Sequence, residues 1–248
     1  MALSVESAHP VEAEQHVRAA ERLLGERVAG ASQVSLAQIK YQLPGIVGQQ
    51  GRAAEAVDLY RTALDLVLNQ GQTLGLLRQI MLYNNLAYQL SLLGELGPAT
   101  QYAQAGIKLA QERGSLTHLS YLLSTSGEIA LALGDLDEAE KLFTEGLALA
   151  RQVPIAERIA GHTANLGLVA IRRGQAELAR ARLREALAQA EAVAASHLGV
   201  RIRLWLAPLV PPDEARALLR QARAVAEPAG FRGLVDEIDR LAATLPER

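Results

Sequence analysis

The sequence predicts an all-α protein, built as a solenoid of antiparallel helix pairs. Of its 248 residues 50% are hydrophobic and only 4% are aromatic, so the apolar mass is mainly Ala and Leu, which favour helices. Apolar residues recur at steps of three and four, as they do along one face of a helix. A Gly followed five residues later by an Ala occurs four times in phase, and a fixed period of this length is typical of helical repeats.

The repeated turn is the clearest local signal. Its glycines are Gly51, Gly94, Gly134 and Gly174, at spacings of 43, 40 and 40 residues. The matching alanines are Ala56, Ala99, Ala139 and Ala179. We expect each Gly to end one helix, because Gly adopts the left-handed C-terminal conformation without a steric penalty. Asp135 follows Gly134 and is placed to cap the next helix.

The whole chain divides into repeats around these turns, with about 12 helices. We expect an N-terminal half repeat over 11–29, four repeats over 33–70, 73–113, 116–152 and 155–193, a degenerate fifth repeat over 198–228 and a capping helix over 231–245. Pro44 falls inside the first helix of the first repeat, where it predicts a kink or a break. In the fifth repeat Pro211-Pro212 replace the Gly turn, and Asp213-Glu214 open the second helix.

The third repeat resembles the tetratricopeptide repeat. Gly127, Gly134-Asp135-Leu136, Ala139 and Phe143 match that motif at the right offsets, whereas Leu123 stands where the motif has Trp. The period of 40 exceeds the usual 34 residues and is similar to bacterial repeats in the sensor regions of MalT-like regulators and related signalling ATPases. HEAT repeats have a comparable period, but the Gly turn and the Ala-x3-Phe spacing favour the tetratricopeptide interpretation. The resemblance implies a right-handed superhelix whose first helices line a concave binding face.

Repeat phase, combined with this resemblance, predicts the side chains on the concave face. Tyr suits recognition because it offers contact area at low entropic cost, and Asn offers both a donor and an acceptor. The candidate binding residues are Gln38, Tyr41, Met81, Asn84, Tyr88, Tyr121, Ser124, Glu128 and Arg172. Core packing is the alternative role of the tyrosines, and it is the role that we expect for Tyr83.

Asn85 and Asn165 occupy one matching repeat position. In the co-chaperone domains that the chain resembles, Asn at this place helps to hold a C-terminal carboxylate together with Lys and Arg. Those basic partners are missing here. We therefore expect both Asn side chains to be structural and to bond a neighbouring helix.

The sequence lacks the residues and motifs that several classes of chemistry require. The chain has no Cys, which excludes disulfides and thiolate metal sites, and its five His show no H-E-x-x-H spacing. Phosphate-binding glycine loops and a G-x-S-x-G nucleophile turn are also missing. We therefore predict no enzymatic activity, no metal and no cofactor. The net charge of −2, the lack of a signal sequence and the lack of an apolar run of roughly 20 residues predict a cytoplasmic protein that binds neither nucleic acid nor membrane.

Charge is uneven along the chain. Residues 151–223 hold twelve Arg against six acidic residues, whereas residues 1–150 have a net charge of −6. The cluster in the fourth repeat is Arg172, Arg173, Arg180, Arg182 and Arg184. It indicates either an acidic partner or a solvated Arg-rich surface, and the second is favoured because the chain has 22 Arg and only three Lys.

Two functions follow as hypotheses. The first is a non-catalytic interaction or sensor domain of a bacterial regulatory protein, which binds a protein or peptide segment, or a small effector. The alternative is an assembly module that forms a homodimer through the N-terminal half repeat or exposed repeat edges. Half a repeat motivates this alternative, because it leaves one apolar flank to be covered.

Overall fold

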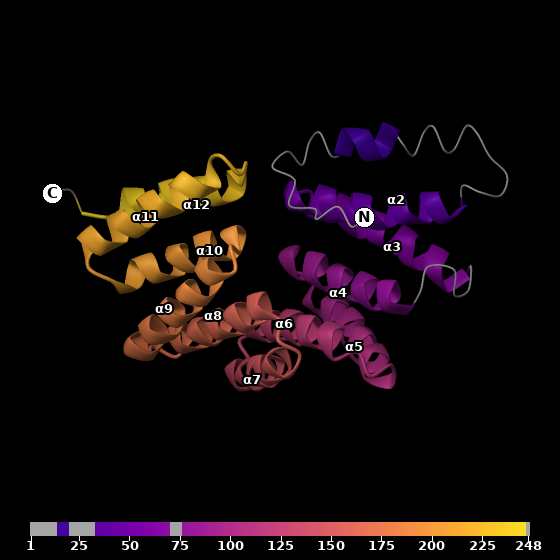
Figure 1. Cartoon of the computed structure of the whole chain (residues 1–248), viewed down its shortest axis with the longest axis horizontal. Coiled ribbons are helices and arrows are strands. Elements are labelled where there is room, and N and C mark those ends of the chain that lie inside the picture. Colours follow the sequence, from indigo (N-terminus) through magenta and orange to yellow (C-terminus); the bar gives the residue numbers. More distant parts are fainter. Residues whose placement is uncertain (1–13, 20–32, 70–75, 247–248) are drawn as a thin grey trace. The chain divides into compact units, whose positions relative to one another are not determined.

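A computed structural model of the chain describes residues 14–19, 33–69 and 76–246 (Figure 1). All regular elements in these ranges are helices, which confirms the predicted all-α helical repeat. The α-helices are α2 (Gln33–Gln49), α3 (Ala53–Asn69), α4 (Leu76–Leu92), α5 (Leu96–Glu112), α6 (Leu116–Leu133), α7 (Leu136–Gln152), α8 (Ala156–Arg172), α9 (Ala176–Ala192), α10 (Ser196–Leu206), α11 (Pro212–Ala226) and α12 (Arg232–Thr244). A 3-10 turn, η1, covers Ala207–Leu209, and residues 14–19 are also helical.

The chain forms two compact units that divide between Ala132 and Leu133. In the first unit, one hydrophobic cluster joins α2 to α5 and includes Leu82 and Leu86, which are fully buried. The second unit holds two clusters. One joins α8, α9 and α10 around Leu183, and the other joins α10, α11 and α12 around Leu204. Each unit therefore has its own core.

The two helices of a pair bury their residues differently. Helix α9 buries a single stripe of four residues, Ala179, Leu183, Ala186 and Ala190. Helix α8 buries an unbroken run over residues 160–167, which covers all sides of the helix. The first helix of the pair is thus enclosed by its neighbours, and the second helix forms an outer layer with one buried face.

Glycine turns join the helices as the sequence predicts. Gly94, Gly134 and Gly174 have φ values of 77°, 82° and 73°. After Gly174 the backbone N–H of Gln175 donates to the carbonyl of Ala170 over 2.9 Å, which closes the Schellman pattern at the end of α8. The side chain of Asp135 accepts from the backbone N–H of Glu138 over 3.1 Å, so the predicted cap of α7 is confirmed.

Pro44 departs from the expectation, because α2 continues through it from Gln33 to Gln49. A proline removes one backbone hydrogen bond and crowds the preceding turn. Here Leu43 and Val47 on either side of it are buried in the first core, and their packing holds the helix together. Of the predicted kink or break at Pro44, the break is therefore wrong, and the kink stays a prediction.

The two ends of the chain differ in how far they are described. Of the expected N-terminal helix over 11–29, residues 14–19 are helical and the remainder lies outside the described residues. In the fifth repeat, α11 begins at Pro212 with Asp213 and Glu214 in its first turn, as expected. None of the described helices combines the length and the hydropathy that crossing a bilayer requires.

Candidate functional site

The buried Asn, Gln, Ser, Thr and His side chains of the described residues all lie on first helices. They are Asn84 and Gln89 on α4, Ser120, Ser124 and Thr125 on α6, and His162, Thr163 and Asn165 on α8. The outer helices α5, α7 and α9 bury only Ala, Gly, Leu and Phe. Because an unbonded buried polar group costs free energy, the hydrogen-bonded members of this set restrict how the first helices pack.

Within the first unit, a chain of hydrogen bonds links α3, α4 and α6. The Thr125 hydroxyl donates to the Asn84 carboxamide oxygen over 2.9 Å, and the Asn84 amide donates to Asn85 over 3.3 Å. The Asn85 amide donates in turn to the Tyr60 hydroxyl over 3.1 Å, and burial raises the pKa of Tyr60 above its ordinary value. Asn85 thus bonds the neighbouring helix, as we expected from its missing basic partners.

This chain of bonds gives Asn84 a structural role. Its side chain is buried, at 7% exposure, and Ser124 is buried as well, at 5%. The Ser124 hydroxyl donates to a Glu128 carboxylate oxygen over 3.3 Å. A ligand would reach these two side chains only over their half-buried neighbours, so a direct binding role for Asn84 and Ser124 stays a prediction.

The half-buried candidates of the first unit are Tyr41, Met81, Tyr88, Tyr121 and Glu128, which come from α2, α4 and α6. The Arg78 guanidinium lies over the Tyr41 ring at 5.7 Å. Burial raises the pKa of Tyr41, although the charge of Arg78 acts in the opposite direction. These five side chains combine apolar contact area with polar ends, which is the composition of a recognition surface. We call them the first-helix surface.

Four of the nine candidates are not part of this surface, and two of them are the buried Asn84 and Ser124 described above. The side chain of Gln38 lies outside the described residues. Arg172 is exposed at the end of α8, in the second unit. The structure therefore places seven of the nine candidate side chains, all of them on α2, α4 and α6, in one unit.

The Arg cluster of the fourth repeat is largely paired within the chain. Arg173 forms ion pairs with Asp137 and Glu140, and Arg180 pairs with Glu177. Arg184 pairs with Glu214 over 2.8 Å. These pairs offset much of the positive charge, which supports the solvated surface favoured from the sequence.

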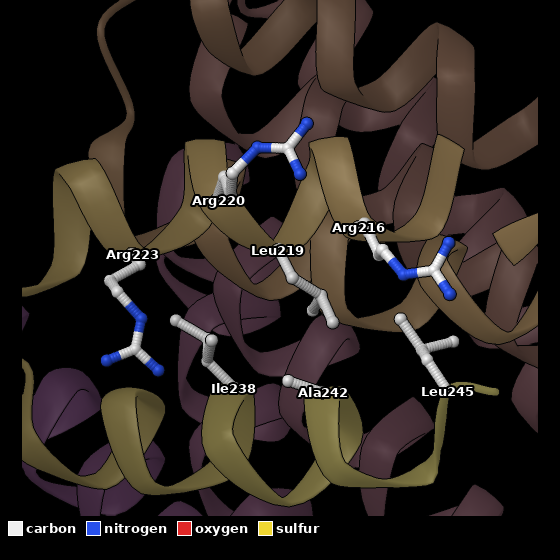
Figure 2. A pocket seen from close by; sticks show the side chains of 7 residues that line it. All are labelled: Arg216, Leu219, Arg220, Arg223, Ile238, Ala242 and Leu245. Carbon is white, nitrogen blue, oxygen red and sulfur yellow. The ribbon is translucent and has the colours of Figure 1, made fainter. Parts of the chain in front are cut away.

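Sequence reasoning missed a pocket between α11 and α12 (Figure 2). Its volume is about 260 Å³, and three of its residues are Arg216, Arg220 and Arg223 of α11. Their spacing of four and three residues already placed them on one face of a helix. The apolar residues that complete the pocket are Leu219 of α11, Ile238 and Ala242 of α12, and Leu245 just after α12. Only the packing of the two helices brings these residues together. No cluster of potential metal ligands occurs among the described residues.

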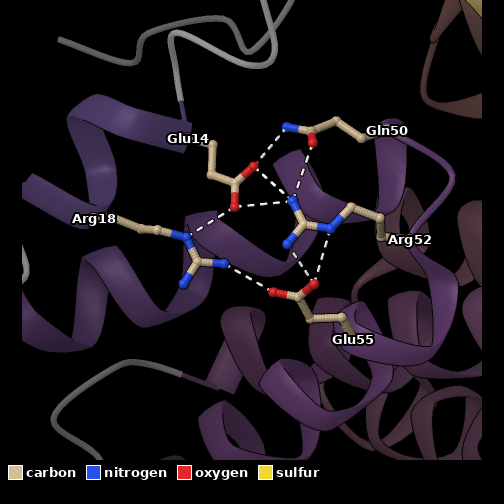
Figure 3. A network of polar contacts seen from close by, with 5 residues as sticks. All are labelled: Glu14, Arg18, Gln50, Arg52 and Glu55. Carbon is tan, nitrogen blue, oxygen red and sulfur yellow. Dashed lines mark hydrogen bonds and ion pairs between the residues drawn. The ribbon is translucent and has the colours of Figure 1, made fainter.

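The helical segment 14–19 is fixed to the first repeat by a polar network (Figure 3). Arg18 and Arg52 each donate to the Glu14 carboxylate over 2.8 Å, and Gln50 donates to it over 2.9 Å. Arg18 also reaches Glu55 over 2.8 Å. Burial acts to raise the pKa of Glu14, but the hydrogen bonds from these partners outweigh it and hold the pKa below its ordinary value. Beside this network, Val17 packs against the first core.

Comparison with known proteins gives a fold. No family model matches the chain, and no curated protein matches it. Among solved structures, a Rap protein complexed with competence and sporulation factor has a TM-score of 0.69 at 16% identity, over 95% of this chain and 72% of that one. A thermophilic TPR protein from Thermus thermophilus has a TM-score of 0.60 at 22% identity, over 84% and 97%.

The chain is built of tetratricopeptide-like repeats. A signal transduction ATPase with a tetratricopeptide repeat sensor from Pyrococcus horikoshii is also similar, with a TM-score of 0.64 at 17% identity. The match covers 92% of this chain but only 35% of that protein. The tetratricopeptide features quoted from the sequence have their expected packing, because Ala139 and Phe143 are both fully buried.

Proposed function

We propose that this tetratricopeptide-like chain is a non-catalytic module that binds a protein or peptide segment on the first-helix surface. The concentration of the described buried Asn, Gln, Ser, Thr and His side chains on first helices carries the proposal, because it gives those helices most of the buried hydrogen-bonding groups. Tyr88 and Tyr121 would supply rigid contact area, and Glu128 would select basic groups.

The comparisons support this kind of partner. The Rap protein that matches 95% of this chain was solved in complex with competence and sporulation factor. The ATPase with a repeat sensor joins similar repeats to a signalling protein. By analogy, we propose a bacterial regulatory role for this chain in the cytoplasm. Its ligand would be a protein or peptide segment, and a small effector is the alternative ligand.

A thermal-shift screen of the full chain tests the proposal. The panel holds peptides with free and blocked termini, nucleotides, sugars and phosphorylated metabolites. A ligand at 100 times its Kd stabilises the folded state by about 2.7 kcal/mol, which gives a clear rise in Tm. Dose-dependent shifts with peptides support the proposal, whereas shifts with other panel members alone would replace the peptide with a small effector.

Variants then locate the binding surface. Tyr88→Ala with Tyr121→Ala should weaken a peptide hit at least tenfold, because truncating central aromatic anchors removes well over 1.4 kcal/mol. Gln104→Ala with Lys108→Ala, on the exposed face of α5, is the matched control. Asn84 is left intact, since its bond to Thr125 would make a loss of binding ambiguous. Equal affinity in both double variants would move the site away from the first-helix surface.

The contacts of segment 14–19 bear on the alternative of self-association. Val17 and the Glu14 network dock this segment onto its own first repeat, which favours a cap. Deleting residues 1–30 should therefore lower Tm without changing the oligomeric state, which light scattering reports as the molar mass relative to that of one chain. A dimer that becomes a monomer on this deletion would instead establish the segment as an assembly device.

A further inference from the structure

Helix α10 carries two arginines with different surroundings. Arg203 forms an ion pair with Glu191 and donates to the carbonyl of Gly199 over 3.0 Å. Arg201 lies on another side of the helix, where its guanidinium carbon stands 4.8 Å from the centre of the Trp205 ring. It makes no hydrogen bond or ion pair with any residue that the structure describes. Only one of the two cations is therefore neutralised within the described chain.

The polar atoms of Arg201 and Trp205 are open to solvent. Both side chains are half-buried, and Trp205 packs against the hydrophobic cluster around Leu183. All three guanidinium nitrogens of Arg201 and the indole nitrogen of Trp205 nevertheless reach solvent, and none has a hydrogen-bond partner among the described residues. A guanidinium held over an aromatic ring by the cation–π attraction keeps its N–H groups available for an anion. The pair thus presents a positioned cation whose donors are unused.

The groups around Arg201 do not compensate its charge. His197 lies one turn before it and Trp205 one turn after it, at the spacing of four residues that places side chains on one face. Burial, and then the charge of Arg201, lower the pKa of His197, so this ring is mostly uncharged at neutral pH. Glu157 of α8, whose charge also acts on His197, is paired with Arg158 over 3.1 Å. This face of α10 therefore carries the positive charge of Arg201.

Repeat packing does not account for the pair. Helix α8 begins 40 residues before α10, so Gly161 and Asn165 occupy the positions of α8 that correspond to Arg201 and Trp205. The repeat thus requires neither a cation nor an indole at these positions. Trp and Arg are, by contrast, the residue types that often dominate the binding energy of protein interfaces. Recognition of a partner explains their proximity better than folding does.

We propose that Arg201 and Trp205 bind an acidic segment of a partner protein. An Asp or Glu carboxylate of the partner accepts two parallel hydrogen bonds from Arg201, and an adjacent apolar side chain contacts the Trp205 ring. Residues 151–223, which include both side chains, hold twelve Arg against six acidic residues, so the charge of this region favours an acidic partner. The site is separate from the first-helix surface and does not depend on the function proposed for it.

Titration of the full chain with a pentapeptide blocked at both termini tests the site. The peptide holds four Glu around a central Leu, and its control has Gln in place of each Glu. Trp205 is the single Trp of the chain, so its fluorescence reports on binding at this pair, and calorimetry repeats each titration. We expect saturable binding of the Glu peptide and at least tenfold weaker binding of the Gln peptide. Succinate should also bind at least tenfold more weakly, because it offers carboxylates without apolar contact to Trp205.

Two substitutions at Arg201 separate charge from geometry. Arg201→Gln should weaken binding of the Glu peptide about tenfold, the loss expected for a hydrogen bond to a charged group. Arg201→Lys keeps the charge but not the two parallel donors, so its affinity should fall between those of Arg201→Gln and the wild type. Arg151→Gln, at an exposed Arg of α7, removes the same charge elsewhere in the second unit and is the matched control. Circular dichroism verifies that each variant is folded.

Each outcome decides the proposal. Affinity for the Glu peptide that is equal in Arg201→Gln and Arg151→Gln, or matched by the Gln peptide, would overturn carboxylate recognition by Arg201. Succinate that binds as tightly as the Glu peptide would overturn the acidic segment in favour of a free small acid. A lack of saturable binding of the Glu peptide in both fluorescence and calorimetry would overturn the site itself.

Discussion

At the scale of single residues, the turn between α9 and α10 differs from the glycine turns. Ala194 adopts a φ of +52°, and the N–H of Ala195 donates to the carbonyl of Ala190 over 2.9 Å, as in the turn at Gly174. The left-handed conformation costs an L-residue roughly 1–2 kcal/mol, a cost that Gly does not carry. Ala194→Gly should therefore raise the free energy of unfolding by about 1 kcal/mol, measured by urea denaturation. Gly174→Ala should lower it by a similar amount, and a loss of stability in Ala194→Gly would contradict this account.

Position 146 of α7 accepts only Gly because it lies against the His162 ring of α8. A Cβ at this position would lie 2.2 Å from His162 Cε1, and the His162 ring is fully buried with Phe143 beside it at 6.3 Å. The ring cannot move away without disturbing the core. Gly146→Ala should therefore destabilise the chain by about 1–3 kcal/mol. The control is Gly233→Ala in α12, where a Cβ meets no atom within 4 Å. A stable Gly146→Ala variant would show that α7 and α8 can separate.

At the scale of elements, His197 links α10 to the start of α12. Its ring meets Phe231 edge-on at 5.1 Å. Burial, and then the charge of Arg201 on the same helix, lower the pKa of His197, and Glu157 of α8 acts weakly in the opposite direction. The unfolded chain therefore takes up this proton first as the pH falls. The contribution of His197 to stability is complete above about pH 6.5 and is lost as the pH falls toward the lower pKa of the folded state.

His197→Gln tests this pH dependence. The loss of unfolding free energy between about pH 7.5 and pH 5.5 should be smaller in the variant than in the wild type, because Gln does not titrate. His118, whose pKa burial also lowers, is retained in both proteins and serves as the common background. Identical pH profiles of the two proteins would exclude His197 as the titrating group.

Much of the element order could be predicted from the sequence, because local signals specify it. Gly134 ends α6 and Asp135 caps α7 through backbone geometry that a few neighbouring residues determine. Pro44 shows where such signals fail. Its local preference for a helix break is overridden by the burial of Leu43 and Val47, which depends on residues distant in sequence.

The candidate site could be predicted only in part. Repeat phase placed Asn84 and Ser124 at equivalent positions on the predicted concave face, yet Asn84 bonds Thr125, one residue further on. The partner depends on how α4 and α6 cross, which sequence spacing does not specify. Sequence reasoning missed the α11–α12 pocket for a related reason. Its apolar residues come from two helices, and no sequence pattern predicts how those helices pack.

At the scale of the whole molecule, the two units have separate cores. Trp205, the single Trp of the chain, packs in the second unit and reports on that unit alone. Circular dichroism reports on the helices of both. We expect the urea transition measured by Trp205 fluorescence and the one measured by circular dichroism to have different midpoints. This is the behaviour of repeat proteins, whose stability is a sum of local contributions.

Leu86→Ala makes this test specific. Leu86 is fully buried in the first unit, and its truncation should cost about 2–5 kcal/mol. The circular dichroism transition should move to lower urea while the Trp205 transition stays in place. A common shift of both signals would show that the two units unfold as one.

The turn that recurs at Gly94, Gly134 and Gly174 also affects how the number of repeats in such a chain can change during evolution. Successive turns are forty residues apart, so an in-frame duplication or loss of one such segment joins a helix end to a turn of the same type. The side chains that face each other differ between junctions, however, because Gly106 meets Leu122 and Gly146 meets His162. A lineage of this protein that gains or loses a helix pair by recombination therefore keeps its turns but has to repack the side chains at the new junction.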